Sequence, residues 1–390
     1  MLEGINPRLI FAIAFVTGMV ALLYIDRNKI ERHSILFIRR TQHGIEHLDT
    51  IAKKAPRFWN AYGWMGVFFA ILSIPLMLFQ MGWIVNNFLQ TGSSEGGPSA
   101  ILPGLTADTT IQGNLQAGAT FIPVEYWVIS IAIIMVVHEA SHGIIARLEG
   151  FEINSVGWLV LGIIPGAFVE PKGMQIGEED ENSEGLGAAE IWDQGNYKQR
   201  LKVLAAGSWA NYVTAAFFGL AYFALILFLL PTFYSGAVHY DAIEGGPGFE
   251  AGMTSGTISS INNQDISSIE DIQSVMNSTS PRDTISIVTS EGEFKFELGE
   301  REGLETGFIG IQFTYPGYIS WFVNLFAMIA FLNLAIGMFN LLPAKPLDGG
   351  HIIDTFVEEF GKEEQRKYVN YFSVFLWIIV LGSLIAALIL

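Results

Sequence analysis

Six long apolar stretches, separated by polar connections, dominate the pattern of the chain. About 17–25 helical residues cross the hydrocarbon core of a bilayer, and each stretch is long enough, or nearly so, to do this. They cover residues 9–25, 61–89, 123–145, 203–230, 319–342 and 369–390. Pro75 predicts a kink in the second helix. The pattern therefore predicts an α-helical polytopic membrane protein with about six transmembrane helices.

The connections between these stretches differ in their basic residues. Connection 26–60 carries eight Lys and Arg residues, whereas connection 90–122 carries none. Because cytoplasmic connections are enriched in Lys and Arg, we expect 26–60 in the cytosol and 90–122 outside. Alternation then places the N-terminus and residues 235–317 outside, with 149–200 and 343–368 inside. No small-residue cleavage site follows the first stretch, so we expect a retained anchor in the cell membrane rather than a signal peptide.

Two connections have a periodicity of their own. Residues 151–171 (FEINSVGWLVLGIIPGAFVEP) are apolar and β-branched, and their glycines and prolines argue against a helix. We interpret them as a re-entrant β-hairpin embedded in the bundle, where protein satisfies its backbone amides. A cytosolic hairpin is the alternative. Residues 240–315 alternate like strands in TISSINN and TISIVTSEGEFKFEL and have helical spacing in SSIEDIQSVMN, which predicts an inserted α+β module.

Composition agrees with a membrane protein and excludes several kinds of chemistry. Hydrophobic residues make up 51% of the 390 residues, and charged residues make up 15%. Cysteine is absent, which excludes thiol catalysis, disulfides and thiolate metal sites. The formal charge of −17 disfavours nucleic acid as a partner, since affinity for nucleic acid comes mainly from cationic contacts to phosphate.

The third apolar stretch ends in ionisable residues, VVHEASH, and these carry the candidate chemistry. His138 and His142 are four residues apart, so a helix places both imidazoles on one face, within reach of a single ion. Glu139 lies beside them, where it can take a proton from water. Neutral imidazole ligands and a carboxylate base are what metal-assisted amide hydrolysis requires. Because ionisable groups in a membrane helix are costly, we predict a metal site rather than a structural histidine pair.

A catalytic zinc site usually has three protein ligands, and without cysteine the third must be His, Asp or Glu. Asp348 is the acid closest to the end of the fifth apolar stretch, in the Pro- and Gly-rich turn NLLPAKPLDGGH. Together with Zn²⁺, ionised Asp348 and Glu139 sum to zero charge, which a low-dielectric site favours. His351 and Asp354 are the alternative third ligands.

A second histidine pattern, HGIEH at 43–47, matches an inverted zinc motif. It lies in the basic connection among Arg39, Arg40, Lys53 and Lys54, whose positive charge disfavours a cation. We interpret this segment as part of a surface helix and not as a catalytic site.

These motifs together resemble the site-2 protease family of intramembrane zinc metalloproteases over residues 120–355. The resemblance rests on HEASH, on NLLPAKPLDGGH from Asn340, and on a PDZ-like segment between them. VGWLVLGIIPGAFVEP and AAGSWANY are similar to the family's membrane-embedded hairpin and the start of its next core span. The GAFVEP form looks most like archaeal-type members.

The resemblance implies that His138, His142 and Asp348 bind Zn²⁺ and that Glu139 is the catalytic base. The implied function is hydrolysis of peptide bonds within or near transmembrane segments, known as regulated intramembrane proteolysis. Because the third span runs inward and His138 lies in its second half, we expect the active site in the cytosolic half of the bilayer.

The resemblance also implies three substrate-binding residues. Asn340 matches the family asparagine that hydrogen-bonds the substrate backbone, with a helix C-cap as the alternative. Asn211 matches an asparagine that follows a glycine, but Ser208 stands where many members have proline. A buried packing hydrogen bond is therefore an equal alternative for Asn211. Gly166 belongs to the GAFVEP end of the hairpin.

The segment GGPGFEAGMTSGTISSINN, from Gly245, resembles the peptide-groove loop of a PDZ domain and the strands that follow it. A PDZ groove takes an extended peptide as an added strand. The expected partners are therefore a transmembrane protein substrate in the lipid bilayer and a peptide or trimmed ectodomain at the groove. The alternative is a structural plug.

The expected organisation has six segments. These are an N-terminal helix with its basic connection (1–60), a second helix with its outer loop (61–122), the first part of the catalytic core (123–235), a PDZ-like domain (236–316), the second part of the core (317–355) and a C-terminal helix (356–390).

Two other functions are compatible with parts of this pattern. A membrane metal-ion transporter would also place His and acidic residues in the bilayer, but the chain lacks the internal repeat typical of transporters. A catalytically inert PDZ scaffold would have no need of Glu139.

Overall fold

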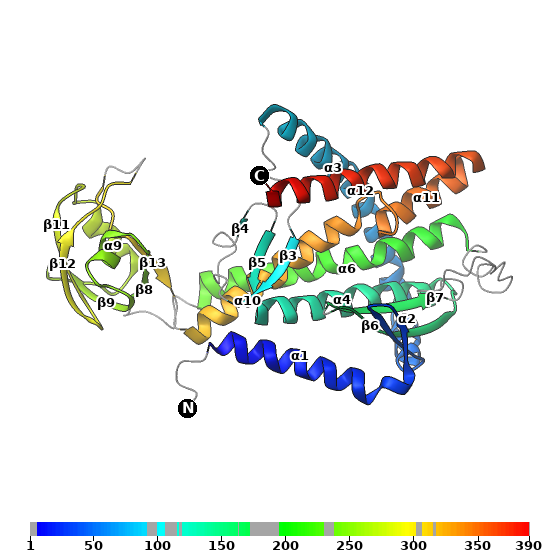
Figure 1. Ribbon diagram of the computed structural model, residues 1–390, viewed down its shortest axis with the longest axis horizontal. Helices are drawn as coiled ribbons and strands as arrows, with labels where there is room; N and C mark the ends of the chain where they lie inside the picture. The colour runs from blue at the N-terminus through cyan, green and yellow to red at the C-terminus, as the bar shows by residue number, and fades with distance from the viewer. Residues whose placement is uncertain are drawn as a thin grey trace. The chain divides into compact units, whose positions relative to one another are not determined.

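Six helices of the computed structural model are long and apolar enough to cross a membrane, which confirms the predicted number among the described residues (Figure 1). They are α1 (Pro7–Ile25), α3 (Pro56–Thr91), α4 (Val124–Leu148), α6 (Tyr197–Ala224), α10 (Gly317–Asn340) and α12 (Arg366–Ile389). The structure describes residues 6–91, 100–105, 115–116, 119–162, 164–171, 195–229, 238–301, 306–314 and 317–389. These helices support a multi-pass membrane protein.

The chain divides into two compact units. Unit 1 consists of Met1–Gly219 and Ala327–Leu390, and unit 2 consists of Leu220–Phe326. The division passes through α6 and α10. The expected boundaries at 236 and 316 lie outside the described residues and stay predictions.

Small residues let the helices of unit 1 approach one another closely, as is typical of membrane bundles. A Cβ atom added at Gly66 of α3 would lie 3.1 Å from the carbonyl oxygen of Ala205 in α6. A Cβ added at Gly337 of α10 would lie 2.9 Å from the Cβ of Asn211. α6 is therefore packed against both α3 and α10, and Figure 1 shows α4, α6 and α10 running side by side.

A four-stranded antiparallel sheet in unit 1 contains the predicted hairpin. Its strands, in spatial order, are β1 (Ile30–His33), β2 (Leu36–Thr41), β6 (Ile153–Leu161) and β7 (Ile164–Pro171). The hairpin at 151–171 is thus confirmed as β6–β7, and its embedding in the bilayer stays a prediction. The pattern of the basic connection did not predict β1 and β2, which this connection contributes.

Strand β7 forms one edge of this sheet and packs against α4. Its end is anchored by Glu170, a buried carboxylate that accepts a hydrogen bond from Ser155 Oγ at 2.6 Å. Arg40 of β2 also forms an ion pair with Glu170, with Nε 3.4 Å from Oε2. These contacts fix the position of β7 beside the third span.

The basic connection also forms a helix, α2 (Ile45–Lys54), which packs against α4. Asp49 of α2 is paired with Arg147 at the end of α4. The hydrogen bond from Arg147, supported by one from Lys53, lowers the pKa of Asp49 to about 2. This ion pair ties the basic connection to the helix that carries the HEASH motif.

A second, small sheet lies in the connection between α3 and α4, where the sequence pattern predicted a loop. Strand β3 (Ala100–Gly104) runs parallel to β5 (Ala119–Pro123), and β4 (Leu115–Gln116) pairs with β5 in the antiparallel sense. Strand β5 leads directly into α4.

Unit 2 is an α+β module, as its periodicity predicts. Five strands form the main path of its sheet, and their spatial order is β12 (Gly292–Glu297), β11 (Thr284–Thr289), β9 (Ser255–Ile261), β8 (Val238–Ala242) and β13 (Ile311–Thr314). The short β10 (Gln264–Asp265) pairs with β9, and the helices α8 (Pro247–Glu250) and α9 (Ile269–Met276) also lie in the unit. Its resemblance to a PDZ domain stays a prediction.

Candidate metal centre

Three side chains from two distant parts of the sequence meet in unit 1. α4 presents His138 and His142 one turn apart, and Asp348 is the first residue of α11 (Asp348–Phe360). The two Nε2 atoms lie 3.1 Å apart, and Asp348 Oδ2 lies 3.4 Å from His138 Nε2 and 3.6 Å from His142 Nε2. Among the described residues, these are the His, Asp and Glu side chains that could hold one metal ion together.

The size of this triangle fits a tetrahedral ion. With metal–ligand bonds of about 2.0–2.2 Å, ligand atoms at a tetrahedral zinc lie roughly 3.3–3.5 Å apart. The three observed distances bracket that value, and two neutral imidazoles with one carboxylate are a common ligand set for zinc. The arrangement therefore fits Zn²⁺.

His142 is oriented by the backbone of α6. Its Nδ1 lies 2.7 Å from the carbonyl oxygen of Val203. Because a carbonyl oxygen can only accept, Nδ1 carries the proton and donates it to this bond. The lone pair of Nε2 is then free for the ion, which is the arrangement expected of a histidine metal ligand.

Asp348 is held by a tight turn between α10 and α11. A Cβ atom added at Gly349 would lie 2.3 Å from the carbonyl oxygen of Leu341, and one added at Gly350 would lie 2.4 Å from Lys345 N. Both glycines of the LDGG segment are therefore needed for the turn to close. Ser208 of α6 donates a hydrogen bond from Oγ to Asp348 Oδ2 at 3.3 Å.

Gly207 of α6 is a site residue that the sequence analysis missed. A Cβ atom at this position would lie 2.3 Å from His142 Nε2 and 2.6 Å from His138 Nε2. A side chain here would occupy the space into which both imidazoles direct their ligand atoms. The glycine of AAGSWANY was the available signal, but a glycine in an apolar helix usually indicates packing alone.

Glu139 lies next to the ligands and contacts the edge of the sheet. The backbone N–H of Val169 in β7 donates a hydrogen bond to Glu139 Oε2 at 3.1 Å. The side chain is half-buried. The expected catalytic base and the outer edge of β7 are therefore adjacent.

The three predicted substrate-binding residues occupy different surroundings. Asn211 is fully buried, with Nδ2 3.1 Å from His138 Nδ1, and so lies behind a predicted metal ligand. Gly166 pairs with Leu159 across β6–β7, and a Cβ there would lie 2.6 Å from Leu159 Cδ1. Asn340 is the half-buried last residue of α10. Their roles toward a substrate stay predictions.

The alternative third ligands do not join the centre. Asp354 forms ion pairs with Lys345 Nζ at 2.8 Å and with Arg366 at 2.9 Å. Burial alone would raise the pKa of Asp354, but hydrogen bonds from Arg366 and Lys345 outweigh it and keep the pKa below its ordinary value. His351 is likewise absent from the cluster around His138.

These ion pairs belong to a network that clamps α11 onto the bundle. Arg200 at the start of α6 binds both carboxylate oxygens of Glu358, at 3.0 and 3.2 Å. Arg366 lies 3.5 Å from Glu358 and also contacts Asp354. The helix that begins with Asp348 is therefore fixed relative to α6.

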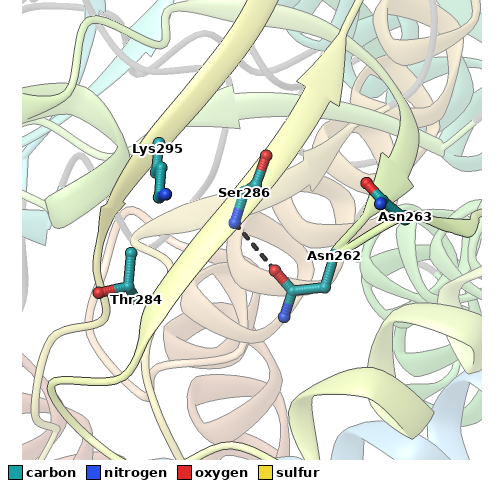
Figure 2. Close-up of a pocket in the computed structure, with 5 residues that line it drawn as sticks. All are labelled: Asn262, Asn263, Thr284, Ser286 and Lys295. Atoms are coloured by element: carbon teal, nitrogen blue, oxygen red, sulfur yellow. Dashed lines mark hydrogen bonds between the residues drawn. The ribbon is translucent and has the colours of Figure 1, made fainter.

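Two other polar positions lack the chemistry of a metal centre. His43 and His47 of the HGIEH pattern are exposed and do not take part in the described cluster. Figure 2 shows the residues that line a polar pocket of unit 2, which are Asn262, Asn263, Thr284, Ser286 and Lys295. The only charged residue in this lining is Lys295, and the lining contains no His, Asp or Glu that could bind a metal ion.

Comparison with known proteins identifies a family and two relatives. A family model described as peptidase family M50 matches residues 126–380, which include all three members of the triangle. An uncharacterized protein of Methanocaldococcus jannaschii is 23% identical, over 97% of this chain and 98% of that protein. A Helicobacter pylori protein named putative zinc metalloprotease is 32% identical, over 44% of this chain and 48% of that protein.

The Gly207→Ala variant tests the geometry of the centre. Because the methyl group would lie between the two Nε2 atoms, we expect the dissociation constant for zinc to rise at least about 100-fold, beyond the loss typical of an outer-shell contact. Zinc competition against a chromophoric chelator measures this. Gly219→Ala is the matched control on α6, since its nearest neighbour would be Ala330 Cβ at 3.9 Å. Equal zinc affinity in the two variants would contradict the geometry.

Proposed function

The chain belongs to peptidase family M50, the site-2 protease family, and we propose that it is a zinc endopeptidase that cleaves membrane proteins within or near their transmembrane segments. The observation that carries this proposal is the grouping of His138, His142 and Asp348 next to Glu139. Family membership supports a metalloprotease, and the six apolar helices support its place in a membrane.

The residues of the centre divide the chemistry of peptide hydrolysis between them. A bound zinc ion would supply Lewis acidity that polarises the scissile carbonyl and lowers the pKa of water. Glu139 would accept the proton of the attacking water and then deliver it to the leaving amine. The Val169 N–H limits the positions that the Glu139 carboxylate can adopt.

The outer edge of β7 is the proposed binding surface for the substrate backbone. A transmembrane helix has its amides already paired, so it must unwind locally before it can be cut. Backbone groups alternate between the two edges of a strand, so Ala167 presents its N–H on the same edge as Val169. An unwound segment added to this edge would lie beside Glu139.

Asn340 and Gly166 would contribute in different ways to binding an unwound substrate segment at the edge of β7. Asn340 ends α10 one short turn before Asp348, where its amide would pin the substrate backbone. Gly166 has its backbone in the β6 ladder, so its contribution is to the packing of β7 against Leu159.

Unit 2 is proposed to bind an extended peptide, such as the end of a trimmed ectodomain. β13 is an edge strand of its sheet and is preceded by Gly310, whose φ is +78°. The segment that begins at Gly245 packs against the start of β13, since a Cβ atom added at Gly310 would lie 2.7 Å from Pro247 Cδ. Titrating a substrate-derived peptide onto the full-length protein tests this, and absence of binding would favour a structural plug.

The charge pattern of the connections supports an orientation in the cell membrane. With 26–60 in the cytosol, the N-terminus and the PDZ-like domain (236–316) would be outside, and the metal centre would lie in the cytosolic half of the bilayer. This can be tested by fusing a reporter that works only in the cytosol to residue 95. Reporter activity would contradict the proposed orientation.

Glu139→Gln separates the protease from its two alternatives. Gln has almost the shape of Glu and still accepts the Val169 N–H, but it cannot take a proton. We therefore expect zinc content to be unchanged and cleavage of a membrane substrate to fall by at least about 10²–10⁴-fold. Equal cleavage by both proteins would exclude the protease, and bound zinc without cleavage in either would favour a metal-ion transporter or an inert scaffold.

Ala167→Pro tests the edge of β7. Proline removes one outward N–H, and edge strands tolerate it, so we expect KM for a membrane substrate to rise several-fold to about tenfold, the weight of roughly one hydrogen bond. Zinc affinity should be unchanged. Ala167→Val is the matched control, because it retains the N–H with a larger side chain. If the proline variant cleaves with the KM of the valine variant, substrate does not add to this edge.

A further inference from the structure

The side of His138 that faces away from Asp348 has a polar neighbour whose hydrogen bonding is incomplete. Asn211 of α6 is fully buried and lies with Nδ2 3.1 Å from His138 Nδ1. Its other polar atom, Oδ1, is buried and has no hydrogen-bond partner among the described residues. A buried amide oxygen without a partner carries its full desolvation penalty.

The second histidine shows what a ligand of this centre requires. A histidine that binds a metal through Nε2 carries its proton on Nδ1, and that proton needs an acceptor. For His142, the carbonyl oxygen of Val203 is this acceptor. For His138, the amide nitrogen of Asn211 cannot be one, because it only donates.

One rotation satisfies both groups. Turning the Asn211 amide by about 180° about its Cβ–Cγ bond exchanges Nδ2 and Oδ1, which are alike in shape. Oδ1 then faces His138 Nδ1–H, so the unpartnered acceptor gains a donor and the histidine gains an acceptor. Both Nε2 atoms, which lie 3.4 and 3.6 Å from Asp348 Oδ2, then carry a lone pair that is free to bind an ion.

We propose that Asn211 is a positioning residue of the metal centre, whose Oδ1 accepts the Nδ1–H of His138 and fixes the tautomer that binds the ion. This inference rests on the proposed zinc site and deepens it. It differs from the substrate contact expected from the sequence, because the Asn211 amide is directed at a ligand. A Cβ at Gly337 would lie 2.9 Å from Asn211 Cβ, so α10 closes the space behind the side chain.

Substituting Asn211 by Leu or by Asp, which are similar to it in size, distinguishes a hydrogen-bond acceptor at this position from a residue that only fills space. Asn211→Leu fills the volume and removes the acceptor, so we expect the zinc dissociation constant of the purified full-length protein to rise about 10–100-fold. In Asn211→Asp both oxygens accept, as in carboxylate–histidine–zinc triads, so its affinity should stay within about threefold of wild type or exceed it. Asn333→Leu is the matched control. Asn333 is another fully buried asparagine with an unpartnered Oδ1, and it donates to Ile329 O of its own helix α10.

The readout is zinc competition without substrate, together with the Co²⁺ absorption spectrum and a melting curve in chelator. Wild-type affinity in Asn211→Leu, or a loss in Asn211→Asp as large as in Asn211→Leu, would overturn the inference and leave the zinc site standing. If Asn211→Leu fails to fold, Asn211→Asp decides alone, since loss of affinity by more than tenfold contradicts acceptance by Oδ1. Failure of the wild-type protein to bind zinc would instead overturn the proposed function.

Discussion

The candidate metal centre of unit 1 depends on bringing three potential ligand atoms within 3.1–3.6 Å of one another inside an apolar bundle. Such a cluster is costly in a membrane unless each polar group has a partner. His138 and His142 come from one helix, but Asp348 arrives from a turn far along the chain. The glycines of that turn and the ion pairs of α11 bring the carboxylate to the imidazoles.

One face of α6 supplies the neighbours of all three candidate ligands. Its residues are spaced by four, one and three positions, which places them on the same side of a helix. They are Val203, Gly207, Ser208 and Asn211. Val203 contributes a carbonyl oxygen to His142, and Gly207 leaves room for both imidazoles because it has no side chain. Ser208 contributes a hydroxyl to Asp348, and Asn211 places its amide beside His138. α6 therefore supports the centre through these contacts, although it contributes none of the three candidate ligands.

The sequence indicates the candidate metal ligands more clearly than it indicates the residues that hold them in place. His138 and His142 stand out because ionisable residues at helical spacing are rare in an apolar run, and Asp348 because a Pro- and Gly-rich turn directs it. Val203 acts through its backbone, which any residue type could provide. Gly207 acts through empty space that only the folded bundle defines. Neither leaves a signature in the pattern of side chains.

The four-stranded sheet was also only partly predictable from the sequence. β6 and β7 follow from an apolar, β-branched segment with a turn, but their neighbour β2 is separated from β6 by more than a hundred residues of sequence, and its Arg39 and Arg40 indicate a cytosolic surface. Only pairing reveals that Arg40 reaches the buried carboxylate of Glu170 and thereby helps to fix the strand beside Glu139. Glu139 and the three candidate metal ligands are thus held by long-range contacts on two sides.

X-ray absorption at the zinc edge on the purified full-length protein tests the metal centre most directly. We predict a first shell of oxygen and nitrogen atoms at about 2.0–2.2 Å with the scattering signature of two imidazoles, reduced to one in His142→Ala and unchanged in His43→Ala. A protein without zinc, or a first shell that His142→Ala leaves intact, would contradict the account.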